Sequence, residues 1–204
     1  SPKNIALTQG PEILDQIIKE LNAARSTVDI AMAWFTNKRL LSKVSELCDN
    51  GIKVRIVLAK NDYNSSTALS DINSKGAQVI YLQGSGYGMM HHKFCLIDGK
   101  RAITGSFNWT ANAVSNSSEN AIFTSEKAII KPLVTEFEKL LGKEVSEKQN
   151  IDRSDSFDDP FIEQLESITS ALIEDYNHDE IESHGYLKGK ESNGISAQLK
   201  GLFD

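Results

Sequence analysis

A histidine and a lysine stand two residues apart in an apolar segment of this chain, at His91 and Lys93. Side chains alternate between the two faces of a β-strand, so these two project together while His92 points away. A neutral imidazole beside an ammonium group suits attack on a phosphodiester. The imidazole supplies the nucleophile, and the lysine offsets charge on the non-bridging phosphate oxygens.

A second set of polar residues follows at fixed spacing. Asp98 comes just before a tight-turn signal, and Gly105, Ser106 and Asn108 come after the next apolar segment. A hairpin would bring Ser106 and Asn108 back beside His91, where their neutral donors can reach the same phosphate. Asp98 falls on the opposite strand face from His91, so we expect a structural salt bridge or hydrogen bond there.

These positions together fit the pattern H-x-K-x4-D-x6-G-S-x-N, with Gly105 as its glycine. In this pattern the sequence resembles the phospholipase D (HKD) superfamily, and residues 4–145 resemble its single-motif bacterial nucleases. The resemblance implies a phosphodiesterase that needs neither metal nor cofactor, with His91, Lys93, Asn108, Ser106 and Glu119 at the catalytic site. It also implies a phosphohistidine intermediate and a hydrogen bond from the His91 ring to Glu119.

That mechanism uses two histidines, one as nucleophile and one as general acid. The chain has the motif once, because His178 and His184 are not followed by a lysine at the same spacing. We therefore predict a two-fold homodimer that places His91 of both subunits around one phosphate. The acidic residues around His178 have no metal-ligand spacing, so we interpret them as a solvated loop.

Three functions fit these observations. The leading one is an endonuclease that cuts DNA or RNA. The second is a phospholipid phosphodiesterase or phosphatidyl transferase, and the third is a nucleic-acid-binding subunit of a larger complex that has lost catalysis. Tyr87, Lys100 and Arg101 are candidate substrate-binding residues, whereas Trp34 and Trp109 are expected in the core or in a pocket wall.

Charge divides the chain into two parts. The net charge is −6, but residues 1–145 carry 17 Lys and Arg against 14 Asp and Glu, while residues 146–204 carry 5 against 14. We predict a catalytic domain over 1–145 and an acidic linker with a helical extension over 146–204. This extension would dock a protein partner or cover the catalytic groove.

Hydrophobic periodicity predicts an α/β fold. Helical spacing recurs over residues 13–21, 40–48, 68–75, 129–141 and 161–173, and strand-like segments cover residues 28–35, 53–58, 79–82, 93–98, 101–104 and 120–124. The alternation of strands and helices predicts a mixed, mostly parallel sheet sandwiched between helices.

Three sequence features indicate the cellular compartment of the protein. Cys48 and Cys95 lie in apolar periodic segments, which favours two buried free thiols over a disulfide. No apolar run approaches the roughly 20 residues that span a bilayer, and residues 1–4 do not resemble a signal peptide. These features predict a cytoplasmic protein with no membrane association.

Overall fold

The computed structural model describes residues 1, 3–84 and 88–151. The described residues form one seven-stranded sheet in the order β1-β7-β6-β5-β2-β3-β4. Its strands are β1 (Asn4–Leu7), β2 (Thr27–Met32), β3 (Lys53–Ala59), β4 (Gln78–Leu82), β5 (Lys93–Ile97), β6 (Arg101–Gly105) and β7 (Ala121–Thr124). Tyr87 and the helix expected over residues 161–173 lie outside the described residues.

The α/β class and the mixed sheet are confirmed, but the sheet is mostly antiparallel. Strands β2, β3 and β4 are parallel, as their βα alternation predicts. The other four pairings are antiparallel, because β5, β6 and β7 follow one another without a crossover helix and β5 adds to the free edge of β2. The prediction extended the parallel pattern of the first half too far.

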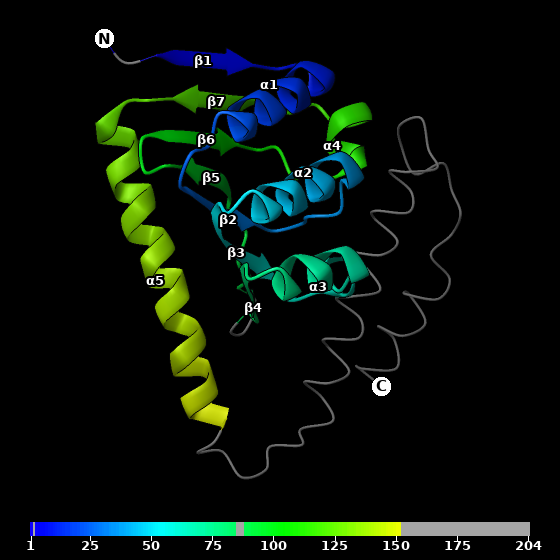
Figure 1. The fold of residues 1–204 in the computed structure, drawn as a ribbon, viewed down its shortest axis with the longest axis vertical. Coiled ribbons are helices and arrows are strands. Elements are labelled where there is room, and N and C mark those ends of the chain that lie inside the picture. The colour runs from blue at the N-terminus through cyan, green and yellow to red at the C-terminus, as the bar shows by residue number, and fades with distance from the viewer. Residues whose placement is uncertain (2, 85–87, 152–204) are drawn as a thin grey trace, which may run out of the picture. The chain divides into compact units, whose positions relative to one another are not determined.

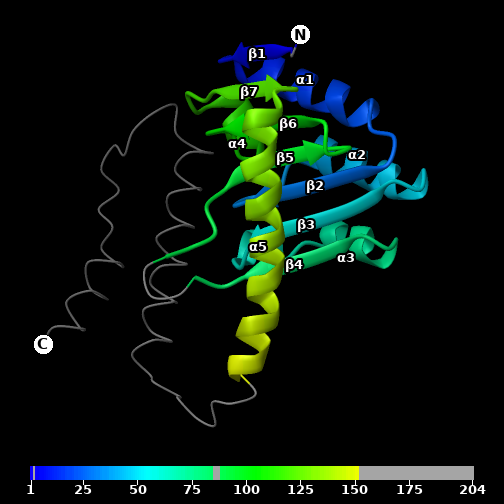
Figure 2. The ribbon, with the colours of Figure 1, turned by 90° about the vertical axis from the view of Figure 1, so that its left-hand side faces the viewer.

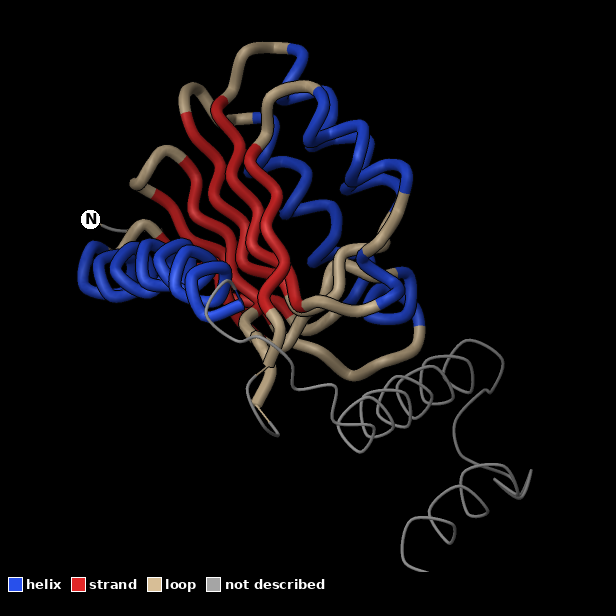
Figure 3. Tube along the Cα trace, turned by 90° about the horizontal axis from the view of Figure 1, so that it is seen from below, coloured by secondary structure: helices blue, strands red, loops and turns tan. Residues whose placement is uncertain are grey.

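Helices cover both faces of the sheet (Figures 1 and 3). Helices α1 (Gly10–Asn22), α2 (Lys38–Asp49), α3 (Thr67–Ser74) and α4 (Ala111–Ser115) pack on one face. Helix α5 (Lys127–Ile151) crosses the other face, and Figure 2 shows it in front of the strands. It buries Ile130, Phe137 and Leu140 against β-strand residues such as Phe94 and Leu96. The predicted sandwich of helices around a sheet is therefore confirmed.

Helix α5 is longer than expected. The sequence predicts an end at Gly142, but the helix continues through this residue to Ile151. Gly142 does not have the positive φ of a helix-ending glycine, and a Cβ there would meet nothing within 4 Å. Pro132 is the sixth residue of the helix, past the first turn, so the N–H that would bond to the Ala128 carbonyl oxygen is missing there.

Three elements were not predicted: the edge strand β1, the short 3-10 helix η1 (Asp62–Asn64) and the five-residue helix α4. Strand β1 pairs with β7 although its four residues show no apolar alternation. The thiols also differ from the prediction in part. Cys95 is fully buried on β5, as expected, whereas Cys48 on α2 is only half-buried.

Candidate active site

The candidate site lies at the carboxyl end of β2, where β5 begins and β6 ends. Met32, the last residue of β2, pairs with Lys93, the first residue of β5. The backbone N–H of Ala33 donates to the carbonyl oxygen of His92 at 2.9 Å, which continues the pairing by one residue. In sheets with parallel strands, the carboxyl edge is the usual location of ligand sites.

His91 and Lys93 lie on the same side of the sheet edge. Lys93 Nζ is 3.2 Å from Nδ1 and 3.3 Å from Nε2 of His91, and it donates to the His91 carbonyl oxygen at 2.9 Å. Because Nζ is almost equidistant from the two ring nitrogens, it lies against the imidazole rather than along one lone pair. The side chain of His91 is exposed and Lys93 is half-buried.

Both groups have lowered pKa values. Burial lowers the pKa of His91 from its ordinary value of 6.5, and the charges of Lys93 and His92 lower it further. Burial also lowers the pKa of Lys93, against the opposing effect of Glu119. Each shift favours the neutral form, since burial disfavours charge. A neutral imidazole is the form that can attack phosphorus.

His92 points to the other face, as the strand alternation predicts. Its Nε2 lies 3.1 Å from Glu136 Oε1 on α5, and its ring meets Phe94 edge-on at 5.3 Å between centroids. Phe94 belongs to the core beneath α5. His92 is therefore separated from the His91 side of the site by the sheet.

Asn108 reaches the site from the segment that follows β6. Its Oδ1 accepts a hydrogen bond from the backbone N–H of Trp34 at 3.3 Å. The next residue, Trp109, forms a parallel bridge with Phe35, and its N–H donates to the Trp34 carbonyl oxygen at 3.1 Å. These bonds hold the Asn108 amide by its Oδ1 against the segment that follows β2.

Ser106 and Glu119 pair with each other. The Ser106 hydroxyl donates to Glu119 Oε2 and accepts from the backbone N–H of Asn120 at 3.0 Å. The hydrogen bond expected between Glu119 and the His91 ring is absent from the described residues. The reason is local. The backbone N–H of Ser106 also donates to the Asn120 carbonyl oxygen at 3.1 Å, which brings Ser106 directly beside Glu119.

Gly105 stands where β6 and β7 approach closely. A Cβ at this position would lie 2.3 Å from the Asn120 carbonyl oxygen, so no larger residue fits without a shift of backbone. The glycine of the motif therefore permits the pairing that holds Ser106 in place.

Asp98 has structural contacts. Its carboxylate accepts from the backbone N–H groups of Arg25, Ser26 and Thr27, between α1 and β2. Burial of the Asp98 carboxyl opposes its ionisation, but the bonds from Thr27, Ser26 and Arg25 outweigh this effect and lower its pKa. These contacts fit the supporting role expected for Asp98.

Lys100 and Arg101, which the sequence predicts to bind substrate, are not brought together with His91 and Lys93. They follow the turn at the far end of β5, about 13 Å along the strand from Lys93 at about 3.3 Å per residue. Arg101 pairs with Glu20 on α1 and approaches Asp98. Both residues are close to His91 and Lys93 in the sequence, but the turn between β5 and β6 that carries them lies at the opposite end of β5 from Lys93.

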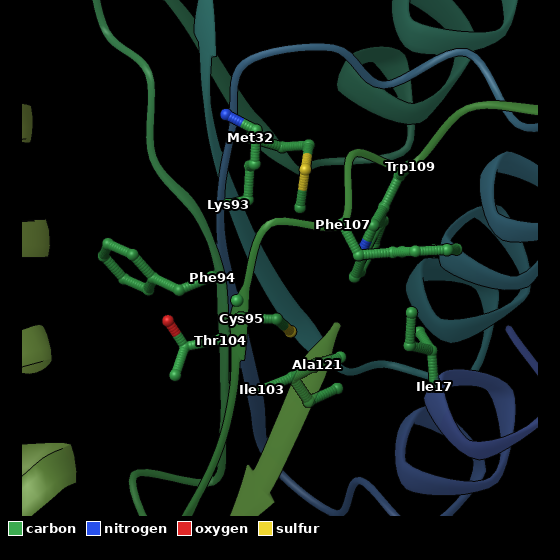
Figure 4. Close-up of a pocket in the computed structure, with 11 residues that line it drawn as sticks. Ile17, Met32, Lys93, Phe94, Cys95, Ile103, Thr104, Phe107, Trp109 and Ala121 are labelled. Atoms are coloured by element: carbon green, nitrogen blue, oxygen red, sulfur yellow. The ribbon is translucent and has the colours of Figure 1, made fainter. Parts of the chain in front are cut away.

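A small apolar pocket lies beneath the site, between the sheet and α1 (Figure 4). Met32, Cys95, Phe107 and Trp109 are among its lining residues. Lys93 contributes its aliphatic stem to this lining, and Figure 4 shows its ammonium end directed away from Cys95. The stem of Lys93 thus lies among mostly apolar residues that line the same pocket.

In the part of the chain that the structure describes, no group of three or more His, Cys, Asp or Glu residues could hold a metal ion. Among the helices of the same residues, none has the length and apolar character needed to cross a membrane.

Comparison with known proteins supports the motif. Residues 17–141 match the family described as "Cardiolipin synthase, PLD-like domain". The chain belongs to the phospholipase D-like family. Among its relatives, the mitochondrial cardiolipin hydrolase of Homo sapiens is 33% identical over 136 residues, which are 66% of this chain and 53% of that protein. The enzyme of that name from Chlamydomonas reinhardtii is 36% identical over 131 residues, 64% of this chain and 58% of that protein. The chain thus spans about half the length of these relatives.

Solved structures show the same phospholipase D-like fold. NucT from Helicobacter pylori has a TM-score of 0.63 and 26% identity, over 70% of this chain and 97% of that one. Nuc from Salmonella typhimurium, a phospholipase D family member, has a TM-score of 0.59 and 19% identity, over 70% and 95%.

One residue of the site was not singled out from the sequence as part of it. Asn64, in the short 3-10 helix after β3, is fully buried. Its Nδ2 donates to the carbonyl oxygens of Ala33 and Ala59 at 2.7 and 2.8 Å, and its Oδ1 accepts from the N–H of Phe35 at 2.9 Å. These contacts fix the segment around Trp34, which contacts both His91 and Asn108. No local sequence signal could reveal them, since they join separate strand ends.

Proposed function

We propose that this protein is a metal-independent phosphodiesterase that cleaves nucleic acid as a homodimer. The observation that carries the proposal is the contact between the neutral-favouring imidazole of His91 and the Lys93 ammonium at an exposed sheet edge. This pair offers a nucleophile and a charge partner for phosphate in one place.

Each residue then has a defined task in the proposed reaction. A ring nitrogen of His91 attacks phosphorus, while His91 of the second subunit protonates the leaving oxygen. The second imidazole next removes a proton from water, and the resulting hydroxide attacks the phosphohistidine, breaking its P–N bond and releasing the phosphomonoester product. Lys93 and the Nδ2 group of Asn108 stabilise the charge on the non-bridging oxygens, and Ser106 and Glu119 support this edge of the site.

The need for two imidazoles supports the dimer. Only one H-x-K triplet occurs in the sequence, so a second copy is the simplest source of the general acid. Mixing tests this directly. If the active site is shared, an excess of His91→Ala subunits will reduce the activity of each wild-type subunit. Independent sites would leave that activity unchanged.

Nucleic acid is the proposed substrate because the motif occurs once and the part of the chain that carries it is mildly basic, with 17 Lys and Arg against 14 Asp and Glu. Such a balance tolerates a polyanion better than the net charge of −6 suggests.

A phospholipid is the second candidate. It is supported by the relatives, whose names describe mitochondrial cardiolipin hydrolases, and by the name of the matching family. These names also make a mitochondrial location the alternative to the cytoplasmic one expected from the sequence, and fractionation of the native protein would distinguish the two locations.

The assay uses the whole chain in EDTA, with plasmid, single-stranded DNA, RNA and cardiolipin-containing vesicles as separate substrates. Cleavage of a nucleic acid that is lost in His91→Ala is the expected result. Turnover of cardiolipin alone would replace the nuclease by a lipid phosphodiesterase. Binding of nucleic acid without turnover would identify the non-catalytic subunit, and a strict need for added metal would refute the mechanism.

The acidic segment over residues 146–204 is proposed to regulate this site or to dock a protein partner. Removal of residues 152–204 leaves the whole of α5 in place. Higher basal cleavage in the shortened chain would support inhibition, and unchanged cleavage would leave docking.

A further inference from the structure

The side chain of Trp34, in the segment that follows β2, contacts the proposed nucleophile, which lies just before β5. Its indole meets the His91 ring edge-on, with 5.7 Å between ring centroids and 90° between the ring planes. The backbone N–H of the same residue holds Asn108 Oδ1 at 3.3 Å. One residue therefore touches both His91 and Asn108, which come from opposite ends of the motif.

The segment that carries Trp34 is anchored on both sides. Asn64, which is fully buried, bonds to the residues before and after it, Ala33 and Phe35. The carbonyl oxygen of Trp34 accepts from Trp109, whose own carbonyl oxygen accepts from the N–H groups of Thr36 and Asn37 at 2.9 and 2.8 Å. The backbone from which the indole projects is therefore fixed by several hydrogen bonds on both sides of residue 34.

The indole is held by packing. Among the described residues, Trp34 Nε1 is buried and has no hydrogen-bond partner. A buried unpaired donor costs stability, so the benefit of a tryptophan here lies in the shape of its ring system. The flat indole restricts rotation of the His91 ring. An exposed histidine without such a neighbour retains that rotation.

We infer that Trp34 is a positioning residue, whose indole holds the His91 ring in the orientation needed for in-line attack on phosphorus. The inference rests on the proposed function. Its effect is on geometry, because misplacement of a reacting group by about 1 Å can reduce the rate about 100-fold. The backbone N–H of residue 34 holds Asn108 whatever the side chain, so only the contact with His91 depends on the indole.

The test compares Trp34→Ala, Trp34→Leu and Trp34→Phe with the wild-type chain. Steady-state hydrolysis of bis(p-nitrophenyl) phosphate gives kcat and KM, and NMR titration of the His91 ring gives its pKa. Leu133→Ala removes a half-buried side chain from α5, on the other face of the sheet, and controls for loss of stability alone.

We expect kcat to fall about 10- to 100-fold in Trp34→Ala and Trp34→Leu, with KM within about twofold. The His91 pKa should rise toward 6.5 in both, because burial is the largest cause of its lowering. Trp34→Phe should restore most of kcat, and Leu133→Ala should change neither quantity. If Trp34→Ala does not fold, the leucine and phenylalanine variants decide the question.

A wild-type kcat and His91 pKa in the leucine variant would overturn the inference, and so would a loss confined to KM or an equal loss of kcat in Trp34→Phe. Failure of the proposed function has a different signature. In that case the wild-type chain hydrolyses no phosphodiester, while the NMR titrations still show whether Trp34 sets the environment of His91.

Discussion

His92 contacts Glu136 on α5, with 3.1 Å between Nε2 and Oε1, while its neighbour His91 faces the opposite side of the sheet. The side chains of two adjacent histidines thus lie on opposite faces of the sheet. The side chains of His92 and Glu136 are 43% and 30% exposed, so the pair contributes little to stability; such pairs are worth about 0–1 kcal/mol. The two histidines form a natural matched pair for mutation.

We predict that His91→Ala reduces phosphodiester cleavage by about 100- to 10,000-fold, the usual range for loss of a reacting imidazole. His92→Gln should retain activity within about twofold, because the His92 side chain contacts Glu136 on the other face of the sheet. Initial rates on the same substrate in EDTA measure both. Similar losses in the two variants would contradict the assignment of the nucleophile to one strand face.

Lys93 should influence the titration of His91 in a defined direction. A nearby positive charge disfavours the imidazolium, so Lys93→Met should raise the His91 pKa. The value should stay below 6.5, because burial, which remains, is the larger cause. NMR titration of the His91 ring measures this without any need for activity. An unchanged His91 pKa would show that the ammonium is not close to the ring in solution.

The same sign sets the acidic limit of the reaction. A lowered pKa means that the His91 nucleophile stays neutral to a lower pH than an ordinary histidine does. The acidic limb of kcat/KM should therefore fall below pH 6.5. In Trp34→Ala that limb should move upward, toward neutral pH. A limb above pH 6.5 in the wild-type protein would contradict the lowered pKa of His91.

Asp98 should matter for stability rather than for the reaction. Asp98→Ala leaves three backbone N–H groups between α1 and β2 without their acceptor, and we expect a loss of about 1–3 kcal/mol in the free energy of unfolding. Because the Asp98 pKa is lowered in the fold, its contribution is present at neutral pH and is lost as pH falls through that pKa.

Asp98→Asn is the matched variant, since asparagine keeps one acceptor oxygen and tolerates the positive φ of 56° at this position. Urea unfolding at pH 7 and pH 3 measures both. We expect the asparagine variant to lose less than the alanine variant, and its deficit to shrink at pH 3. A large loss of kcat with normal stability would contradict a structural role.

Gly105→Ala should disturb the Ser106 side of the site. The new methyl group would lie 2.3 Å from the Asn120 carbonyl oxygen, so β6 and β7 must separate. We expect about 1–3 kcal/mol of destabilisation, as for other overpacked positions, together with reduced kcat. Gly99→Ala is a useful control, because it also has a positive φ but meets nothing within 4 Å. Equal effects on kcat would exclude a local role for Gly105.

Much of the fold could be predicted from local pattern. Apolar stripes such as that of α1, with Ile13, Ile17 and Leu21 in the core, marked the helices correctly. Alternation of side chains placed His91 and Lys93 together and His92 apart. What failed depended on distant partners: β1 forms only because β7 offers an edge, and α5 passes Gly142 because nothing there ends the helix.

The site followed the same division. The residue types of the motif were apparent from spacing alone, whereas the pairing of Arg101 with Glu20, 81 positions away, was not. The contact of Ser106 with Glu119 depends on the register of β6 and β7, which local sequence pattern does not specify. Asn64 and Trp34 complete the site through contacts between the ends of separate strands.

Because Cys95 is buried on β5, its reaction with a thiol reagent can be used to detect detachment of that strand. The thiol is fully enclosed two residues from Lys93, and burial raises its pKa far above the neutral range, so a maleimide or an aromatic disulfide reagent should reach it only when β5 detaches. Replacing the half-buried Cys48 by serine would leave a single labelling position in the chain. The rate of modification would then measure how often β5 detaches from the sheet near His91 and Lys93, before and after substrate is added.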